Sequence, residues 1–329
     1  MKLVESVAGA WNRFFFSGFS DQSLGLLRIY FGCGLLLFHV SQFPHILALD
    51  PLGPAFRFTV PMWHFELLGI HTHVPWLTPV VFLVMMLATV AMTLGRWTRP
   101  AIILVILCVF YLKGVRDSFA GDVHHRYLMP MQMLVLLLVS RCGEVRSWDA
   151  RRRAGVATPA ISEWQASWPI KTMQIYVASF YFWSVVAKLR VSGLEWFIGG
   201  GKIQEILISR AVRWSGVETR ELFFNPLAFE IANSPLVLHA LGLLTLLMEM
   251  GFPLILLITS PRWRLVALLA VAGFHIVNFV LLSVMFLMIP IVFFVFFDLA
   301  PVQAWLSTRL RRTMRTTSGG AAPAADASR

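Results

Sequence analysis

The amino-acid sequence predicts an all-α fold, a polytopic transmembrane helical bundle of about eight spans with interfacial helices on its outer side. Two observations favour this class over a soluble domain. Hydrophobic residues make up 57% of the chain and charged residues only 14%, and the mean hydropathy is +0.71. Long apolar runs also recur along the chain, separated by charged residues or by Pro and Gly.

The apolar runs predict eight spans, near residues 23–45, 76–95, 99–118, 122–140, 170–189, 235–260, 264–283 and 284–300. The third and fourth contain uninterrupted apolar runs shorter than the ~20 residues that a bilayer requires. The last two form one run that is too long for a single helix and needs a turn near Ser283, so seven spans remain an alternative.

The N-terminal segment lacks the apolar core and small-residue cleavage site of a secretory signal, so the first apolar run is expected to stay in the mature protein. Residues 1–304 are expected to form the membrane domain. Residues 305–329 are expected to form a cytoplasmic tail that is first basic and then disordered, because its last part contains only small and polar residues with one arginine at the end.

The distribution of charge predicts the orientation of the bundle. With the N-terminus inside, the inner segments carry 17 Lys and Arg against 7 Asp and Glu, whereas the outer segments carry 10 against 9. Such an excess on one side is what the positive-inside rule predicts for cytoplasmic loops, and an even number of spans places both termini there. Topology therefore explains the net charge of +11, and no nucleic-acid partner is indicated.

Ionisable residues inside the spans are the candidate functional groups, because charge within a membrane is costly. Glu249 is the acid that lies deepest in a span, and His275 or Asn278, three residues apart on one helical face, is its expected partner. Lys188 and His125 lie at similar depths, ~25 Å from the inner edges of their spans at ~1.5 Å per residue. Lys188 would either snorkel to the interface or point into a cavity as a neutral base.

The histidines and cysteines do not suggest a metal or a disulfide. The sequence contains nine histidines and three cysteines, and none of the histidines falls in a predicted cytoplasmic loop. The pairs in "HTH" and "HH" lack a Cys or carboxylate at a recognised ligand spacing, so no metal is predicted. Imidazole near the outer side instead suits proton transfer.

Five stretches resemble the HTTM superfamily, the membrane domain of vitamin K-dependent gamma-carboxylase and its bacterial relatives. In chain order they are "SLGLLRIYFGCGLLL", "VHHRYLMPMQMLVLLLVSRCGEVRSWDA", "IYVASFYFWSVVAKLRVSGLEWF", "LLMEMGFPLILL" and "GFHIVNFVLL". The resemblance covers roughly residues 20–300. It implies an integral protein of the bacterial inner membrane, with an active site on the outer side that agrees with the charge distribution.

The resemblance also implies roles for individual residues. Lys188 aligns with the lysine that deprotonates the quinol in the carboxylase, His125 with a histidine of the carboxylation half-reaction, and His275 with the histidine of an "FHxxN" stretch. The implied cofactor is a reduced quinone of vitamin K or menaquinol type. The expected pocket residues are His124, Tyr127, Phe182, Trp183, Glu249 and Asn278.

Three departures keep a second function open. Ala187 replaces one lysine of the family's pair, Arg190 replaces a downstream acid, and the large lumenal domain of the eukaryotic enzyme has no counterpart in this sequence. One hypothesis is therefore a quinol-linked enzyme, carboxylase-like or an oxidoreductase, whose partners are membrane lipid and quinol. The other is a non-catalytic scaffold or small-solute carrier. The sequence indicates no protein partner.

The segment at residues 190–234 is expected to form two interfacial helices over the mouth of the Lys188 site. The first would present one apolar stripe, formed by Ile203, Ile206, Leu207, Ala211 and Trp214. These helices would act either as a movable cover or as a structural plug.

Overall fold

The computed structural model describes residues 2–47, 58, 60–120, 128–153, 161–198, 200–214, 222–282, 288–305 and 308–309. Helices dominate this part of the chain, which confirms the all-α class. An antiparallel hairpin adds two short strands, β1 (Val212–Trp214) and β2 (Leu222–Phe224), with Val212 opposite Phe224.

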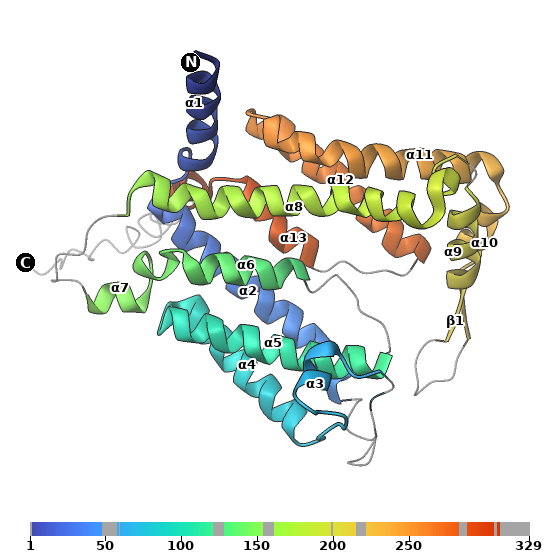
Figure 1. Ribbon diagram of the computed structural model, residues 1–329, viewed down its shortest axis with the longest axis horizontal. Coiled ribbons are helices and arrows are strands. Elements are labelled where there is room, and N and C mark those ends of the chain that lie inside the picture. The colour runs from blue at the N-terminus through green and yellow to red at the C-terminus, as the bar shows by residue number, and fades with distance from the viewer. Residues whose placement is uncertain are drawn as a thin grey trace, which may run out of the picture.

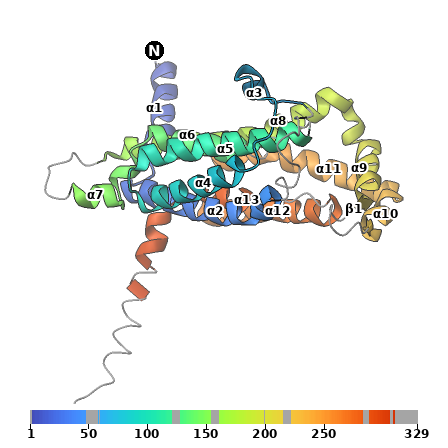
Figure 2. The ribbon, with the colours of Figure 1, turned by 90° about the horizontal axis from the view of Figure 1, so that it is seen from below.

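The long helices run side by side and form the bundle (Figures 1 and 2). They are α2 (Asp21–Leu47), α4 (Leu77–Leu94), α5 (Thr98–Ala120), α6 (Leu128–Val139), α8 (Glu163–Ser192), α11 (Pro235–Gly251) and α12 (Pro261–Leu282). α8 contacts α2, α6 and α11, and one apolar core runs between these helices, with Leu24, Phe31 and Val177 almost completely buried. α8 therefore occupies the middle of the bundle and meets most of its neighbours.

Five helices of the described residues are long and apolar enough to cross a membrane: Asp21–Ser41, Leu77–Leu94, Thr98–Phe119, Pro235–Leu257 and Pro261–Leu282. α8 has 30 residues, ~45 Å at 1.5 Å per residue, and spans the same thickness, although its charged residues lower its hydropathy. The fourth predicted span corresponds to α6, with only 12 residues, and the eighth to the short α13 (Met288–Phe293) and η6 (Phe294–Phe296). Residues 122–127 and 284–287 of these two predicted spans lie outside the described residues, so the count of eight stays a prediction.

The connecting segments gather at two ends of the bundle, as the charge analysis grouped them. One end, the α7 end, contains η3 (Cys142–Glu144), α7 (Trp148–Arg152) and the start of α8. The opposite end, the α9 end, contains α3 (Trp63–Leu67) and α9 (Gly201–Ala211) (Figure 1). The predicted inner segments thus meet at the α7 end and the predicted outer segments at the α9 end.

Helix α1 (Lys2–Phe16) leaves the bundle at the α7 end, roughly perpendicular to α8 (Figure 1). It is amphipathic, and Trp11 and Phe16 on it are exposed. Its attachment to α8 includes Lys171, whose amine lies 4.9 Å from the centre of the Phe14 ring. A helix with this orientation and exposed aromatic residues suits the plane of a membrane interface.

Arg28 connects three segments at the α7 end. Its side chain is fully buried and donates to four backbone carbonyls, those of Met92 at 2.5 Å, Thr93 at 2.8 Å, Arg146 at 2.8 Å and Cys142 at 3.2 Å. Met92 and Thr93 belong to the last turn of α4, where carbonyls lack their regular helical donors and a cation is favourable, although the Met92 carbonyl also accepts from the Gly95 N–H at 3.0 Å. One guanidinium therefore joins α2, the end of α4 and the segment around η3.

The segment at residues 190–234 partly matches its prediction. α9 and α10 (Pro226–Ala232) pack together, and Ile203, Leu207 and Ala211 of the expected stripe are buried. Trp214 does not continue this stripe, because the helix ends at Ala211 and Trp214 lies in β1. α9 also packs on α11 and α12 at the α9 end.

Gly242 of α11 permits a close backbone contact that positions η4 (Gly193–Trp196). A Cβ atom at this position would lie 2.7 Å from the carbonyl oxygen of Trp196 and 3.0 Å from that of Phe197. We expect Gly242→Ala to destabilise the protein by ~1–3 kcal/mol, because backbone cannot move aside as a side chain can. Gly273→Ala in α12 is the matched control, since nothing lies within 4 Å there. Equal thermal unfolding midpoints for the two variants in detergent would contradict the prediction.

Candidate functional site

Lys188 and Glu249 form an ion pair between α8 and α11. The Lys188 amine lies 2.6 Å from Oε1 and 2.5 Å from Oε2 of Glu249, and it also donates to the Ser184 hydroxyl at 2.8 Å. Ser184 in turn donates to Oε1 of Glu249 at 3.2 Å. The two charged side chains are only 18% and 8% exposed. The site is therefore a partly enclosed triad in which the carboxylate accepts from both neighbours.

A second polar pair lies on the same face of α8. Tyr181 precedes Lys188 by seven residues, about two helical turns, so the two side chains point in similar directions. The buried Tyr181 hydroxyl lies 2.7 Å from Nε2 of His275 on α12, and Phe252 packs its ring 4.3 Å from the Tyr181 ring. Which of the two atoms donates depends on the tautomer of His275.

Local sequence explains how the triad is held. Ser184 and Lys188 are four residues apart and therefore lie on one helical face, which lets the hydroxyl support the amine. Glu249 lies near the end of α11, where η5 (Phe252–Leu257) begins. Pro253 has no N–H for the carbonyl of Glu249, so the regular helix cannot continue there. The carboxylate thus occupies a point at which the span changes from α to 3₁₀ geometry.

The turn after α8 covers the amine. Gly193 ends α8 with φ of +58°, and η4 follows immediately. The Trp196 ring of η4 lies 5.5 Å from the Lys188 amine, within the range of a cation–π contact. The buried Phe197 comes next and rests with its carbonyl against Gly242. The α9 end therefore covers Lys188 with an aromatic ring and leaves the amine partly accessible.

The structure reproduces one pairing prediction and corrects its details. Glu249 is buried and paired, as expected, but its partners are Lys188 and Ser184 and not His275 or Asn278. His275 instead bonds Tyr181, and Asn278 makes no hydrogen bond to another described residue. Helix rotation decides this, because the face of α12 with His275 meets Tyr181, one helical turn away from Ser184.

Two predicted pocket residues face away from the site. Phe182 and Trp183 are 41% and 62% exposed, so they project outward from α8 and do not wall the amine. Trp183 lies about 200° around the helix from Tyr181 at 100° per residue, which explains why both cannot line one pocket. Tyr181, absent from the predicted site, takes that place. The spacing of 181, 184 and 188 was the signal that could have revealed it.

The other predicted site residues cannot be compared with the structure. His124, His125 and Tyr127 lie outside the described residues. The role of His125 as a second acid or base therefore stays a prediction.

Sequence reasoning missed another buried ion pair near the α9 end. On α5, Lys113 pairs with Asp117 four residues later, and their side chains are 10% and 2% exposed. His64 of α3 packs close by, with its ring 4.0 Å from the Phe110 ring. Burial, and then the charge of Lys113, hold the pKa of His64 below its usual value. The spacing of four residues was visible in the sequence, but their burial was not.

The comparisons with known proteins identify a family. A family model described as the HTTM domain matches residues 16–301. No match to this chain was found among curated proteins or among solved structures. The matched range includes every helix from α2 to α13, and therefore the Lys188–Glu249 pair and the Tyr181–His275 pair.

Proposed function

The chain belongs to the HTTM domain family, and from this premise we propose that it is a membrane enzyme that deprotonates a lipid-soluble hydroxyl compound. The compound is a reduced quinone of vitamin K or menaquinol type, taken from the bilayer near the α9 end. Proton removal would activate the quinol for a carboxylase-like reaction or an oxidation. Lys188 would be the base, and His275 with Tyr181 a second acid–base pair.

The observation that carries this proposal is the Lys188–Glu249–Ser184 triad. Ionisable side chains within spans are rare because desolvating them is costly, and those that occur mark functional sites. The triad and the Tyr181–His275 pair both use one face of α8, about two helical turns apart, so two groups that exchange protons lie along the same helix. Apolar walls near both pairs suit a flat, lipid-soluble substrate better than a polar one.

The Lys188–Glu249 pair can act as a base if a proton first moves from the amine to the carboxylate. Transfer of one proton from the ammonium of Lys188 to the carboxylate of Glu249 leaves two neutral groups, at no net change of charge. The neutral amine then accepts the proton of the quinol hydroxyl and becomes ammonium again, and the quinol becomes an anion. Ser184 and Trp196 would hold the amine in position during these steps. This scheme replaces the expectation of a neutral lysine with no carboxylate nearby.

The experiment uses the absorption of the quinol anion, which differs from that of the neutral quinol. We expect purified protein in nanodiscs to produce the anion from added menaquinol under anaerobic conditions. Lys188→Arg retains a cation for Glu249 but holds its proton too tightly to act as a base, so the signal should fall by at least 100-fold. Lys202→Arg is the control, because Lys202 lies outside the triad and pairs with Glu205 on α9. An undiminished signal in Lys188→Arg would exclude Lys188 as the base.

A second function rests on the same contacts. The amine of Lys188 is already bonded to Glu249 and Ser184, so the triad could simply join α8 to α11 in a non-catalytic scaffold or solute carrier. Quinone extracted from the purified protein distinguishes the two. The enzyme should retain a quinone at close to one per chain, whereas a scaffold or carrier of other solutes should retain none above the level of the surrounding lipid.

The proposal includes a location in the bacterial inner membrane with both termini cytoplasmic and the Lys188 site facing outward. Its support is the concentration of positive charge in the segments of the α7 end. After Cys33, Cys108 and Cys142 are replaced by serine, a cysteine introduced at Glu218 should react with an impermeant reagent added to intact cells. Reaction only after permeabilisation would reverse both the topology and the side on which substrate enters.

A further inference from the structure

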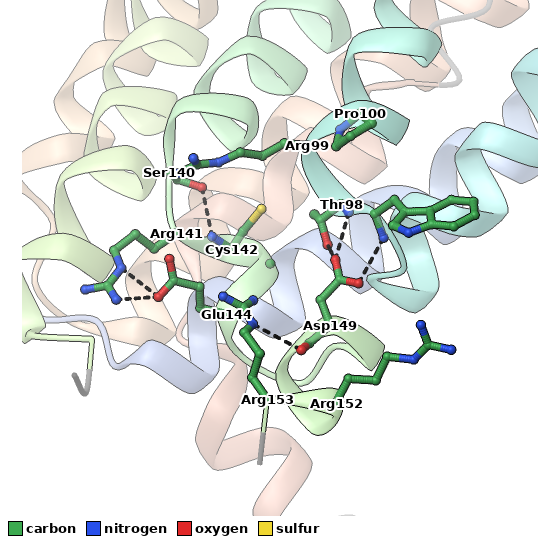
Figure 3. Close-up of a pocket in the computed structure, with 12 residues that line it drawn as sticks. Thr98, Arg99, Pro100, Ser140, Arg141, Cys142, Glu144, Asp149, Arg152 and Arg153 are labelled. Carbon is green, nitrogen blue, oxygen red and sulfur yellow. Dashed lines mark hydrogen bonds and ion pairs between the residues drawn. The ribbon is translucent and has the colours of Figure 1, made fainter. Parts of the chain in front are cut away.

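A basic pocket of about 440 Å³ opens at the α7 end, far from the Lys188 site along the bundle. It lies between the start of α5, η3 and α7 (Figure 3). Four arginines line it, namely Arg99, Arg141, Arg152 and Arg153, against two acids, Glu144 and Asp149. The lining therefore has an excess of positive charge, and its residues come from three separate segments.

Both acids already accept hydrogen bonds from other groups. The Asp149 carboxylate accepts from the backbone N–H groups of Trp97 and Thr98, each at 3.0 Å, and from the Thr98 hydroxyl at 3.1 Å. Burial raises the pKa of Asp149, but these hydrogen bonds outweigh it and hold the pKa below its usual value. Glu144 accepts from two nitrogens of Arg141. The first N–H groups of α5 are thus occupied as well, so an anion in the pocket must be bound by arginine side chains.

The arginines divide into two that are held in place and two that are not. Arg141 donates to Gln165 at 2.8 Å besides its pair with Glu144, and Arg153 donates to the carbonyl of Asp149 at 3.2 Å. Arg99 and Arg152 make no hydrogen bond or ion pair with other described residues, and both are exposed. Two guanidinium groups therefore stay available for an oxyanion, which the planar group binds through two parallel hydrogen bonds.

Tryptophan side chains indicate the depth of the pocket in the membrane. Trp97 lines it and is 62% exposed, and Trp148 at the start of α7 is also exposed. Trp164, near the start of α8, and Trp263, near the start of α12, add exposed rings at the same end of the bundle. Trp63 and Trp76 are exposed at the α9 end, so exposed tryptophans mark both ends of the bundle, as they do at the two headgroup regions of a bilayer. The pocket therefore opens where lipid phosphates lie.

We propose that this pocket binds the phosphate of an anionic phospholipid headgroup, such as phosphatidylglycerol. Arg99 and Arg152, whose exposed side chains extend in different directions in Figure 3, turn to contact the phosphate, Arg141 and Arg153 add positive charge from fixed positions, and Trp97 packs against the glycerol and upper acyl chains. The bound lipid joins α5 to α7 and so stabilises the α7 end. The pocket is separate from the quinol site, and its function does not depend on that proposal.

The experiment measures lipid binding by native mass spectrometry of the whole chain, titrated with phosphatidylglycerol or phosphatidylcholine. Arg99→Gln/Arg152→Gln should weaken binding of phosphatidylglycerol roughly 25-fold, at about fivefold for each positive charge near a membrane surface. Arg151→Gln/Arg262→Gln is the matched control. It removes the same charge from exposed positions near the α7 end that do not line the pocket, and it should change binding less than twofold.

Three results would overturn the proposal. An equal loss of binding in the control variant would mean that general surface charge attracts the lipid. Equal affinity for phosphatidylcholine would remove the need for a net anion. Inorganic phosphate and phosphatidylglycerol can also be compared at equal concentration for their protection against thermal unfolding. Equal protection by the two would mean that the site binds a free anion. Both variants should unfold at the wild-type temperature without added lipid, because all four arginines are exposed, and Arg99 and Arg152 make no hydrogen bond or ion pair with another described residue.

Discussion

Replacing Arg28 with methionine is expected to destabilise the protein by at least ~4 kcal/mol, because four carbonyls lose a charged donor and, among the described residues, only that of Met92 keeps another donor, the Gly95 N–H. Methionine has a similar length and fills most of the same space, so little of this loss would come from a cavity. The carbonyls of Met92, Thr93, Arg146 and Cys142 would all lose their charged partner. No water reaches the side chain to replace it, since Arg28 is fully buried.

Arg28→Lys separates charge from geometry. A lysine keeps the positive charge near the end of α4, but its compact ammonium cannot reach carbonyls on both α4 and the η3 segment as the guanidinium does. We expect this variant to recover less than half of the stability that Arg28→Met loses. Arg13→Met is the control, because Arg13 is an exposed residue of α1. Thermal unfolding in detergent measures all three, and a small change in Arg28→Met would show that the carbonyls find other donors.

The second large effect concerns the Lys188–Glu249 pair. Lys188→Met or Glu249→Leu alone should cost about 3–5 kcal/mol, since each leaves one charge buried without a partner. The double variant should recover most of this loss, because two apolar side chains of similar volume pack well where an ion pair stood. We therefore expect the loss of Lys188 to destabilise the fold. An unpaired amine at the mouth of a cavity could be removed without this cost.

A double-mutant cycle tests the pairing directly. The two single variants and the double variant should give a coupling energy of about 1–3 kcal/mol. The pair formed by Lys202 and Glu205 provides the control cycle, since it joins two exposed side chains on α9 and should give less than ~0.5 kcal/mol. Additive effects at Lys188 and Glu249 would mean that the two residues do not interact. Additivity would also remove the main support for the proposed base.

The fold class could be predicted because it depends on a sum over many residues, and the predicted orientation rests on a sum of the same kind. No single side chain decides whether the chain enters a membrane, and the excess of Lys and Arg in the predicted inner segments holds even if one boundary is misplaced. The lengths of individual spans depend on local geometry instead. Within the described residues, the fourth predicted span overlaps α6, and the last one overlaps α13 and the 3₁₀ turn η6.

The candidate site could be predicted only in part. The cost of charge in a membrane identified Lys188 and Glu249 separately, and the same cost implied that each needs a partner. The expected partners of Glu249 were polar residues of the next predicted span, and these were His275 and Asn278. Nothing in the residue types excluded that choice, because histidine, asparagine and lysine can all bond a carboxylate.

The sequence by itself determined that this protein is a helical membrane bundle with its positive charge at one end, and that ionisable groups lie inside it. Only the tertiary structure decided which of those groups meet. Lys188 and Glu249 are 61 residues apart, and Arg28 lies 114 residues from the carbonyl of Cys142. Such contacts depend on how each helix is rotated and which neighbour it packs against. A rotation of ~100°, one residue along a helix, would turn Lys188 away from Glu249 without changing composition, hydropathy or charge.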